Sequence, residues 1–99
     1  MADRGIDAVR AHLAKLPPSD SLTTAERRAQ YERAEKVFPT PADVKVERVN
    51  APAAPAEWLR PPSAEPGRVV LYLHGGGYVI GSPRSHRHLA AAIAAAAGA

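Results

Sequence analysis

Residues 69–78 read VVLYLHGGGY, which is five continuously apolar residues followed by a histidine, three glycines and a tyrosine. Such an apolar run is typical of a strand that an α/β sheet covers on both faces. Ser82 and Pro83 predict the start of a helix, and the alanine-rich run 89–97 predicts its body up to Gly98. Strand, glycine-rich loop and helix form the first half of a βαβ unit, so the sequence predicts the α/β class.

Two shorter stretches upstream predict a pair of antiparallel strands. Valines alternate loosely with charged residues over 44–49, as in a strand with one buried face. Residues 56–60 form the second candidate strand, bounded on both sides by proline-containing turns. We expect these two strands to pair with each other.

The N-terminal part is polar and helical in pattern. Four apolar residues are spaced like one face of a short helix that a proline pair ends: Ile6, Val9, Leu13 and Leu16. A second helix is expected to begin with a capping box at Thr23 and to run to Pro39, with Glu32 and Lys36 forming an i,i+4 pair. Its apolar face is narrow, so we expect it to lie on a surface, either as a lid or as an ordinary helical hairpin.

Length and composition exclude several classes. The 99 residues suffice for one small domain, and the absence of cysteine excludes a disulfide scaffold, a zinc ribbon and a cysteine nucleophile. The 13 basic and 10 acidic residues are interspersed, which argues against a nucleic-acid partner. The longest apolar run, 89–97, is shorter than the roughly 20 residues of a membrane span. With Asp3 and Asp7 the N-terminus does not resemble a signal peptide, so we expect a cytoplasmic protein.

The glycine-rich stretch 74–78 follows the predicted strand, where α/β proteins gather their ligands, and successive glycines leave amides free to bind an anion. A phosphate-binding loop would fit Gly76 and Gly81, but Ser82 stands where its lysine should be. A dinucleotide fingerprint that begins with Gly75 and Gly77 would require glycine at position 80, but Ile80 stands there and Gly81 comes one residue late. An HGGG-type oxyanion hole for acyl transfer fits without adjustment.

These residues resemble the hormone-sensitive-lipase-like esterases of the α/β-hydrolase superfamily. The resemblance covers about residues 44–99 and rests on segments in the family's order and spacing: 56–61, 69–73, 74–78, 81–82 and 85–86. It implies an incomplete, N-terminal part of an α/β-hydrolase fold. Residues 1–40 would form a helical cap segment, and residues 41–99 would begin the hydrolase core.

The resemblance also implies a role for each residue of the loop. The amides of Gly76 and Gly77 would donate to the oxyanion, Gly75 would allow the turn, and His74 would brace the loop without acting as the catalytic base. Tyr78 is a candidate substrate contact, with simple packing as the alternative. The substrate would be a small-molecule ester, and no cofactor is implied.

The chain departs from the family in lacking a catalytic triad. The family's serine lies in G-x-S-x-G, after the HGGG loop and before Asp and His. No acidic residue follows Glu65, and none of the five serines lies in that motif: Ser19, Ser21, Ser63, Ser82 and Ser85. Ser82 is better explained as a helix N-cap than as a nucleophile. His74, His86 and His88 are possible metal ligands, but His86 and His88 lie on different faces of the predicted helix and no carboxylate follows them, so we expect no metal site.

We therefore expect the N-terminal fragment of a carboxylic ester hydrolase that is inactive by itself. A non-catalytic remnant or a partner-binding module is the first alternative. A nucleotide-binding fragment is the second alternative, and the missing lysine argues against it.

Overall fold

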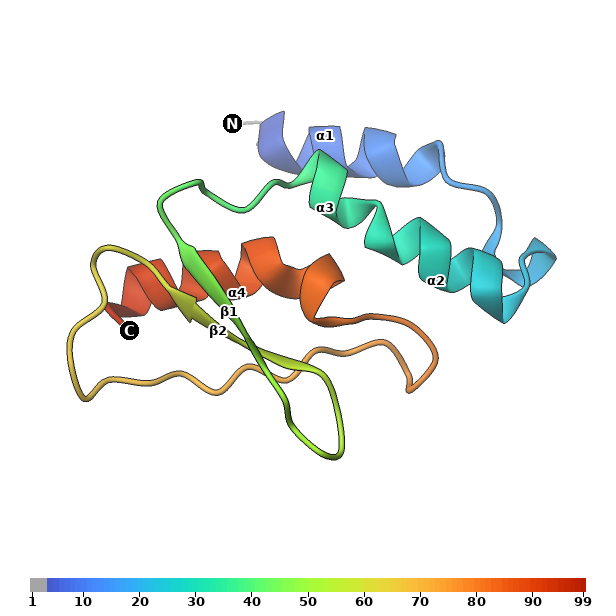
Figure 1. Ribbon diagram of the computed structural model, residues 1–99. Helices are drawn as coiled ribbons and strands as arrows, with labels where there is room; N and C mark the ends of the chain where they lie inside the picture. Colours follow the sequence, from blue (N-terminus) through green and yellow to red (C-terminus); the bar gives the residue numbers. More distant parts are fainter. Residues whose placement is uncertain (1–3) are drawn as a thin grey trace.

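The computed structural model describes residues 4–99 and places a C-terminal helix between a helical layer and a β-hairpin (Figure 1). In the described part of the chain, no helix has the length and hydropathy needed to cross a membrane. In chain order the elements are α1 (Arg4–Ala14), a 3-10 turn (Ser19–Ser21), α2 (Thr24–Glu32), α3 (Ala34–Val37), β1 (Lys45–Val49), β2 (Ala56–Arg60) and α4 (Pro83–Ala97).

The N-terminal helices begin as predicted but do not continue as predicted. The capping box of α2 is confirmed, because the Thr23 hydroxyl accepts the Glu26 N–H while the Thr23 N–H donates to the Glu26 carboxylate. The prediction of one helix up to Pro39 was wrong, since Arg33 ends α2 and α3 begins after it. Glu32 does not pair with Lys36 in the described residues. It accepts a hydrogen bond from Ser82 at the start of α4 instead.

Helix α1 exposes the apolar face that its spacing predicts. Ile6, Val9 and Leu13 lie on the helix and are all exposed, while Leu16 lies beyond its end. An amphipathic helix gains most of its stability when this face is buried. The remaining elements therefore contribute the tertiary packing of the described chain.

The predicted strand pair is confirmed. Strands β1 and β2 are antiparallel, with Val46 opposite Leu59 and Glu47 opposite Trp58. Arg60 forms an ion pair with Glu47 of the other strand, and its guanidinium lies 5.5 Å from the centre of the Trp58 ring. Charge pairing and cation–π contact thus support the end of the hairpin at which β2 continues into residues 61–73.

The prediction of a buried strand at 69–73 was wrong for the described chain. This segment has no ladder partner within residues 4–99, and Leu71 and Leu73 are 82% and 79% exposed. A strand pairs its backbone groups with a neighbour and gains stability from three or more strands with a covered face. The hairpin does not provide that neighbour, so the segment runs as an extended link from the hairpin to the loop.

Both predicted ends of α4 are confirmed. The Ser82 hydroxyl accepts the Ser85 N–H, Pro83 opens the first turn, and Gly98 takes the left-handed conformation with φ of 68°. The Ala99 N–H donates to the Ala94 carbonyl and the Gly98 N–H to the Ala95 carbonyl, as in a Schellman motif. These hydrogen bonds join residues close in sequence, so the length of α4 does not depend on strand pairing by residues 69–73.

The buried face of α4 is made of small side chains. Ala91 is only 1% exposed and Ser85 only 2%. Small residues let the backbones of neighbouring elements approach closely, and α4 contacts both β2 and the α2–α3 layer. The described chain has no large side chain that is fully buried, so polar contacts carry much of the tertiary specificity.

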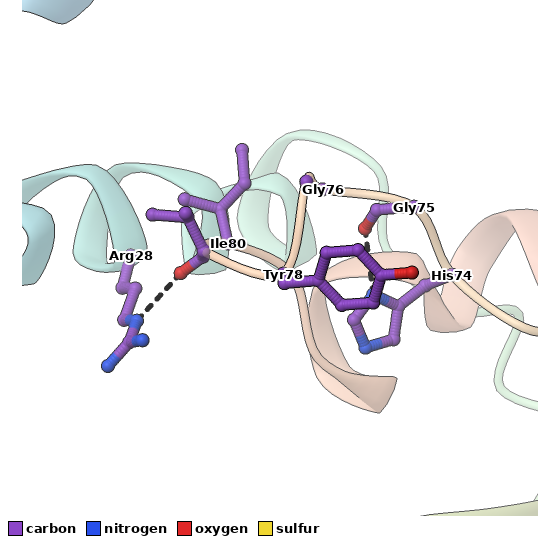
Figure 2. Close-up of a pocket in the computed structure, with 9 residues that line it drawn as sticks. Arg28, His74, Gly75, Gly76, Tyr78 and Ile80 are labelled. Carbon is purple, nitrogen blue, oxygen red and sulfur yellow. Dashed lines mark hydrogen bonds between the residues drawn. The ribbon is translucent and has the colours of Figure 1, made fainter.

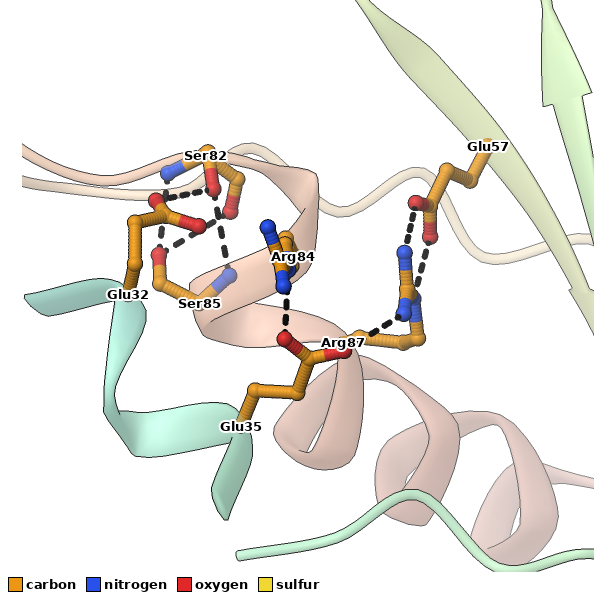
Figure 3. Close-up of polar contacts among 7 residues, drawn as sticks. All are labelled: Glu32, Glu35, Glu57, Ser82, Arg84, Ser85 and Arg87. Carbon is orange, nitrogen blue, oxygen red and sulfur yellow. Dashed lines mark hydrogen bonds and ion pairs between the residues drawn. The ribbon is translucent and has the colours of Figure 1, made fainter. Parts of the chain in front are cut away.

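Arg87 of α4 is the centre of these polar contacts (Figure 3). Its guanidinium donates to both carboxylate oxygens of Glu57 on β2, over 2.9 and 2.5 Å, and lies 3.5 Å from the carboxylate of Glu35 on α3. Arg84 pairs with the same Glu35. The hydrogen bond to Glu57 raises the pKa of Arg87 above its ordinary value, against the opposing effect of burial. One helix is therefore tied to both layers by charge.

An aromatic contact adds to the packing of α3 on α4. The rings of Phe38 and His88 stack with centroids 5.0 Å apart. The Nδ1 atom of His88 is buried and has no hydrogen-bond partner among the described residues. Burial lowers the pKa of His88 from 6.5, and the neighbouring His86 lowers it further.

We predict that Arg87→Met lowers the free energy of unfolding by about 1–3 kcal/mol, because the Glu57 carboxylate loses two charged hydrogen bonds at a side chain only 9% exposed. Urea titration of the full-length protein measures the change. Arg68→Met is the matched control, since its pair with Glu65 is exposed and should contribute less than about 1 kcal/mol. Equal losses in the two variants would contradict a central role for Arg87.

We also predict that acid weakens the packing around His88. Because its pKa is lowered on folding, the unfolded chain takes up a proton on His88 at a higher pH than the folded protein does. The contribution is complete above pH 6.5 and declines as the pH falls from 6.5 towards the folded-state pKa. Thermal unfolding across this range should show the loss, and His88→Phe, which keeps a ring against Phe38, should reduce it. An unchanged acid sensitivity in that variant would argue against His88.

Candidate functional site

The glycine-rich loop forms one wall of a partly open cavity of about 510 Å³ (Figure 2). The lining consists of residues 74–81 and one side chain from α2, that of Arg28. The loop lies between the extended segment 69–73 and the N-terminus of α4. The cavity thus coincides with the stretch that the sequence singled out.

Three successive residues give the loop its shape. Gly76, Gly77 and Tyr78 have φ angles of 136°, 61° and 62°. The Gly76 carbonyl accepts hydrogen bonds from the N–H groups of Val79 and Ile80, over 3.1 and 3.2 Å. The chain therefore reverses in a tight turn in which a non-glycine residue, Tyr78, is held in the left-handed region, at a cost of about 1–2 kcal/mol.

Residues 76 and 81 must be glycine for steric reasons. A Cβ atom at Gly76 would lie 2.0 Å from the carbonyl oxygen of Ile80, and one at Gly81 would lie 2.7 Å from Nδ1 of His74. Gly75, which the family resemblance associates with the turn, has open space around its Cα and does not have a positive φ. Gly81 was not predicted to be part of this loop, although its spacing from Gly76 fits a phosphate-binding loop.

The amides of Gly76 and Gly77 are free donors. Within residues 4–99 neither N–H group donates to a protein acceptor, and both residues line the cavity. Unpaired amides in a glycine turn can hold an anion or an oxygen atom that gains negative charge. This is the chemistry the loop has available.

His74 connects the start of the loop to α4. Its Nδ1 atom lies 2.8 Å from the Gly75 carbonyl oxygen, and its ring stacks on His86 with centroids 5.3 Å apart. His86 also stacks on Tyr31 of α2, at 6.3 Å. His74 thus belongs to an aromatic contact between the loop and two helices.

The neighbouring Ser85 and His86 do not form a nucleophile and base. The Ser85 hydroxyl lies 2.9 Å from Nδ1 of His86, a distance that would suit such a pair. However, Ser85 is 2% exposed, and its hydroxyl also accepts the Ser82 N–H and donates to the Ser82 carbonyl. It therefore completes the capping box of α4, and the prediction of Ser82 as an N-cap is confirmed.

Tyr78 projects from the loop without packing. Its side chain is fully exposed, and the residue lines the cavity (Figure 2). The alternative that this ring simply packs against the protein was wrong for the described chain. An unburied aromatic ring at the edge of a cavity is free to contact a ligand.

Arg28 is the residue that sequence reasoning missed. Its Nε donates to the Val79 carbonyl over 2.7 Å, and the contact spans 51 residues of chain (Figure 2). In the sequence of this polar helix, Arg28 looks the same as the charged residues whose side chains face solvent. No signal in the local pattern would have identified it.

The sequence of this chain is similar to those of known hydrolases. Residues 70–99 match the family model of the alpha/beta hydrolase fold. An acetyl-hydrolase of Streptomyces hygroscopicus is 48% identical over 77 residues, which cover 74% of this chain and 24% of that protein. An ethyl acetate hydrolase of Pseudomonas putida is 34% identical over 94 residues, covering 85% of this chain and 30% of that protein.

Solved structures agree over nearly the whole chain. An esterase of the bacterial hormone-sensitive lipase family superposes with a TM-score of 0.80 and 41% identity, covering 99% of this chain and 33% of that one. An esterase/lipase from an uncultured bacterium gives 0.83 and 37%, with the same coverage. The chain spans about a quarter to a third of the length of these relatives. The expected fold class is confirmed, and in sequence and structure this chain is similar to part of the esterases of the hormone-sensitive lipase family, within the α/β-hydrolase superfamily.

Proposed function

We propose that this chain supplies the oxyanion hole of a carboxylic ester hydrolase, with the amides of Gly76 and Gly77 as its donors. The observation that carries the proposal is the pair of unpaired N–H groups on a positive-φ glycine turn that lines a cavity. Similarity to esterases supports the choice of an ester carbonyl over other anions. His74 and Gly75 support the loop from its N-terminal side.

The proposed chemistry is acyl transfer through a serine nucleophile. The serine attacks the carbonyl carbon of a small-molecule ester, and the carbonyl oxygen takes up negative charge. The Gly76 and Gly77 amides donate to that oxygen in the transition state, the alcohol leaves, and water then hydrolyses the acyl-enzyme. We place the serine and its acid and base partners outside these 99 residues, because no serine lies in G-x-S-x-G, no acidic residue follows Glu65, and Ser85 caps α4. The chain by itself is therefore expected to be inactive.

The N-terminal helices are proposed to form a cap over this site, with residues 1–40 as the cap segment and residues 41–99 as the beginning of the core. The side chain of Arg28, which reaches the cavity from α2, supports this division. No cofactor enters the proposed reaction, and the acetyl esters in the names of two relatives are the first substrates to assay.

A nucleotide-binding role is disfavoured by charge. In phosphate-binding loops the phosphate sits at the N-terminus of the following helix. In this chain the Glu32 carboxylate lies there, 2.5 Å from the Ser82 hydroxyl. A phosphate would meet a negative charge at that position, and no lysine compensates for it.

Gly76→Ala in the full-length protein should lower kcat for an acetyl ester by about 100-fold to 1000-fold, as expected when an oxyanion donor is displaced. The added Cβ would contact the Ile80 carbonyl and force the turn open. Gly67→Ala is the matched control, since it also adds a methyl group at a positive φ but in open space away from the loop. An unchanged kcat for Gly76→Ala would refute the oxyanion assignment.

Tyr78→Ala should raise KM by about two- to tenfold, because the ring offers apolar surface to the substrate. The thermal midpoint should not fall, because the ring is fully exposed among residues 4–99 and an alanine at residue 78 would have the same positive φ. Tyr78→Phe keeps the ring and separates its contribution from that of the hydroxyl. A wild-type KM for the alanine variant would remove Tyr78 from the binding site.

A further inference from the structure

Helix α2 contacts the chain around the glycine-rich loop at two points. Arg28 donates from Nε to the Val79 carbonyl over 2.7 Å, and Glu32 accepts from the Ser82 hydroxyl over 2.5 Å. Residues four apart lie on the same face of a helix, so one face of α2 makes both contacts. Figures 2 and 3 show these contacts, which flank residues 80 and 81.

The hydrogen bond from Arg28 to Val79 is linked through the Gly76 carbonyl to a proposed oxyanion donor, the Gly77 amide. Val79 accepts from Arg28 with its carbonyl and donates with its own N–H to the Gly76 carbonyl. The Gly76 carbonyl and the Gly77 N–H belong to one planar trans peptide, in which the two groups point in opposite directions. Fixing the carbonyl therefore fixes the direction of the Gly77 N–H.

Few other contacts restrain this part of the chain. Residues 69–81 form neither helix nor strand, and Tyr78 is fully exposed. The remaining hydrogen bonds of the loop are local, between the Gly76 carbonyl and two nearby amides and between His74 and Gly75. The stacking of His74 on His86 holds the beginning of the loop, and the His74 ring also lies close to Gly81 at its end. Within residues 4–99, the side-chain hydrogen bond that reaches residues 77–81 from another element comes from Arg28 of α2.

We propose that Arg28 and Glu32 are positioning residues, which together clamp the oxyanion loop from α2. Arg28 acts as a hydrogen-bond donor to a neutral carbonyl, so its donor atom matters more than its charge. A shift of α2 would turn the Gly76–Gly77 peptide, which makes donor geometry depend on the placement of the cap helix. The catalytic part of this inference rests on the proposed function, whereas the conformational part does not.

Side chains of matched length separate the donor from the charge. Gln places Nε2 as many bonds from Cα as the Nε of arginine, and so keeps the donor without the charge. Met places a methyl group there, and so removes both the donor and the charge. Arg33 is the control position, because it lies at the end of the same helix, is exposed, and has no side-chain partner within residues 4–99.

The first readout is amide hydrogen exchange of Val79 and Ile80 in the full-length protein, since both amides bond to the Gly76 carbonyl. Arg28→Met should speed this exchange by about five- to tenfold, the effect of losing one hydrogen bond, while Arg28→Gln should stay near wild type. Arg33→Met should change nothing. Glu32→Met should speed exchange as well, by releasing Ser82.

The second readout is turnover of an acetyl ester. Arg28→Met should lower kcat by about tenfold with little change in KM, because the donors act in the transition state, and Arg28→Gln should restore it. Unchanged exchange in Arg28→Met, or a Gln variant as fast as the Met variant, would overturn the clamp. A wild-type protein that hydrolyses no ester would count against the proposed function, and the exchange measurement would still decide the clamp.

Discussion

The bidentate contact between Arg87 and Glu57 is the interaction on which the described fold depends most. It joins α4 to the hairpin, and the same guanidinium faces Glu35 of α3 on the other side of the helix. A pair of charged hydrogen bonds between a guanidinium and one carboxylate is both strong and directional. The apolar contribution is small here, because α4 buries alanines and none of the large side chains is fully buried in the described chain. Charge therefore sets the orientation of α4, and with it the end of the glycine-rich loop.

The loop takes its conformation from three sources that lie far apart in the sequence. The N-cap at Ser82 fixes where it ends, the stacking of His74 on His86 fixes where it begins, and α2 holds its second half through Arg28. Each source is a polar or aromatic contact with its own geometry. The site can thus keep a defined shape although the preceding segment 69–73 is unpaired in the described chain.

Features set by neighbouring residues were predictable from the sequence. The capping box at Thr23 and the ends of α4 at Ser82 and Gly98 rest on hydrogen bonds between residues a few positions apart, so residue type and spacing suffice. Long-range features were not predictable. The apolar segment 69–73 has the composition of a covered strand, but pairing must come from another strand. The partner of Arg28 is 51 residues away in the sequence. The sequence also does not show which of the three consecutive glycines has no room for a side chain.

The close approach of Gly76 to Ile80 has a consequence for sequence drift. The group that excludes a side chain at residue 76 is the backbone carbonyl oxygen of residue 80, and every amino acid has that oxygen. Substituting Ile80 cannot relieve the conflict, so no second-site change at that position would rescue a bulkier residue 76. Residue 80 is therefore free to vary with its apolar surroundings, whereas residue 76 must stay glycine because the main chain leaves no room for a Cβ atom.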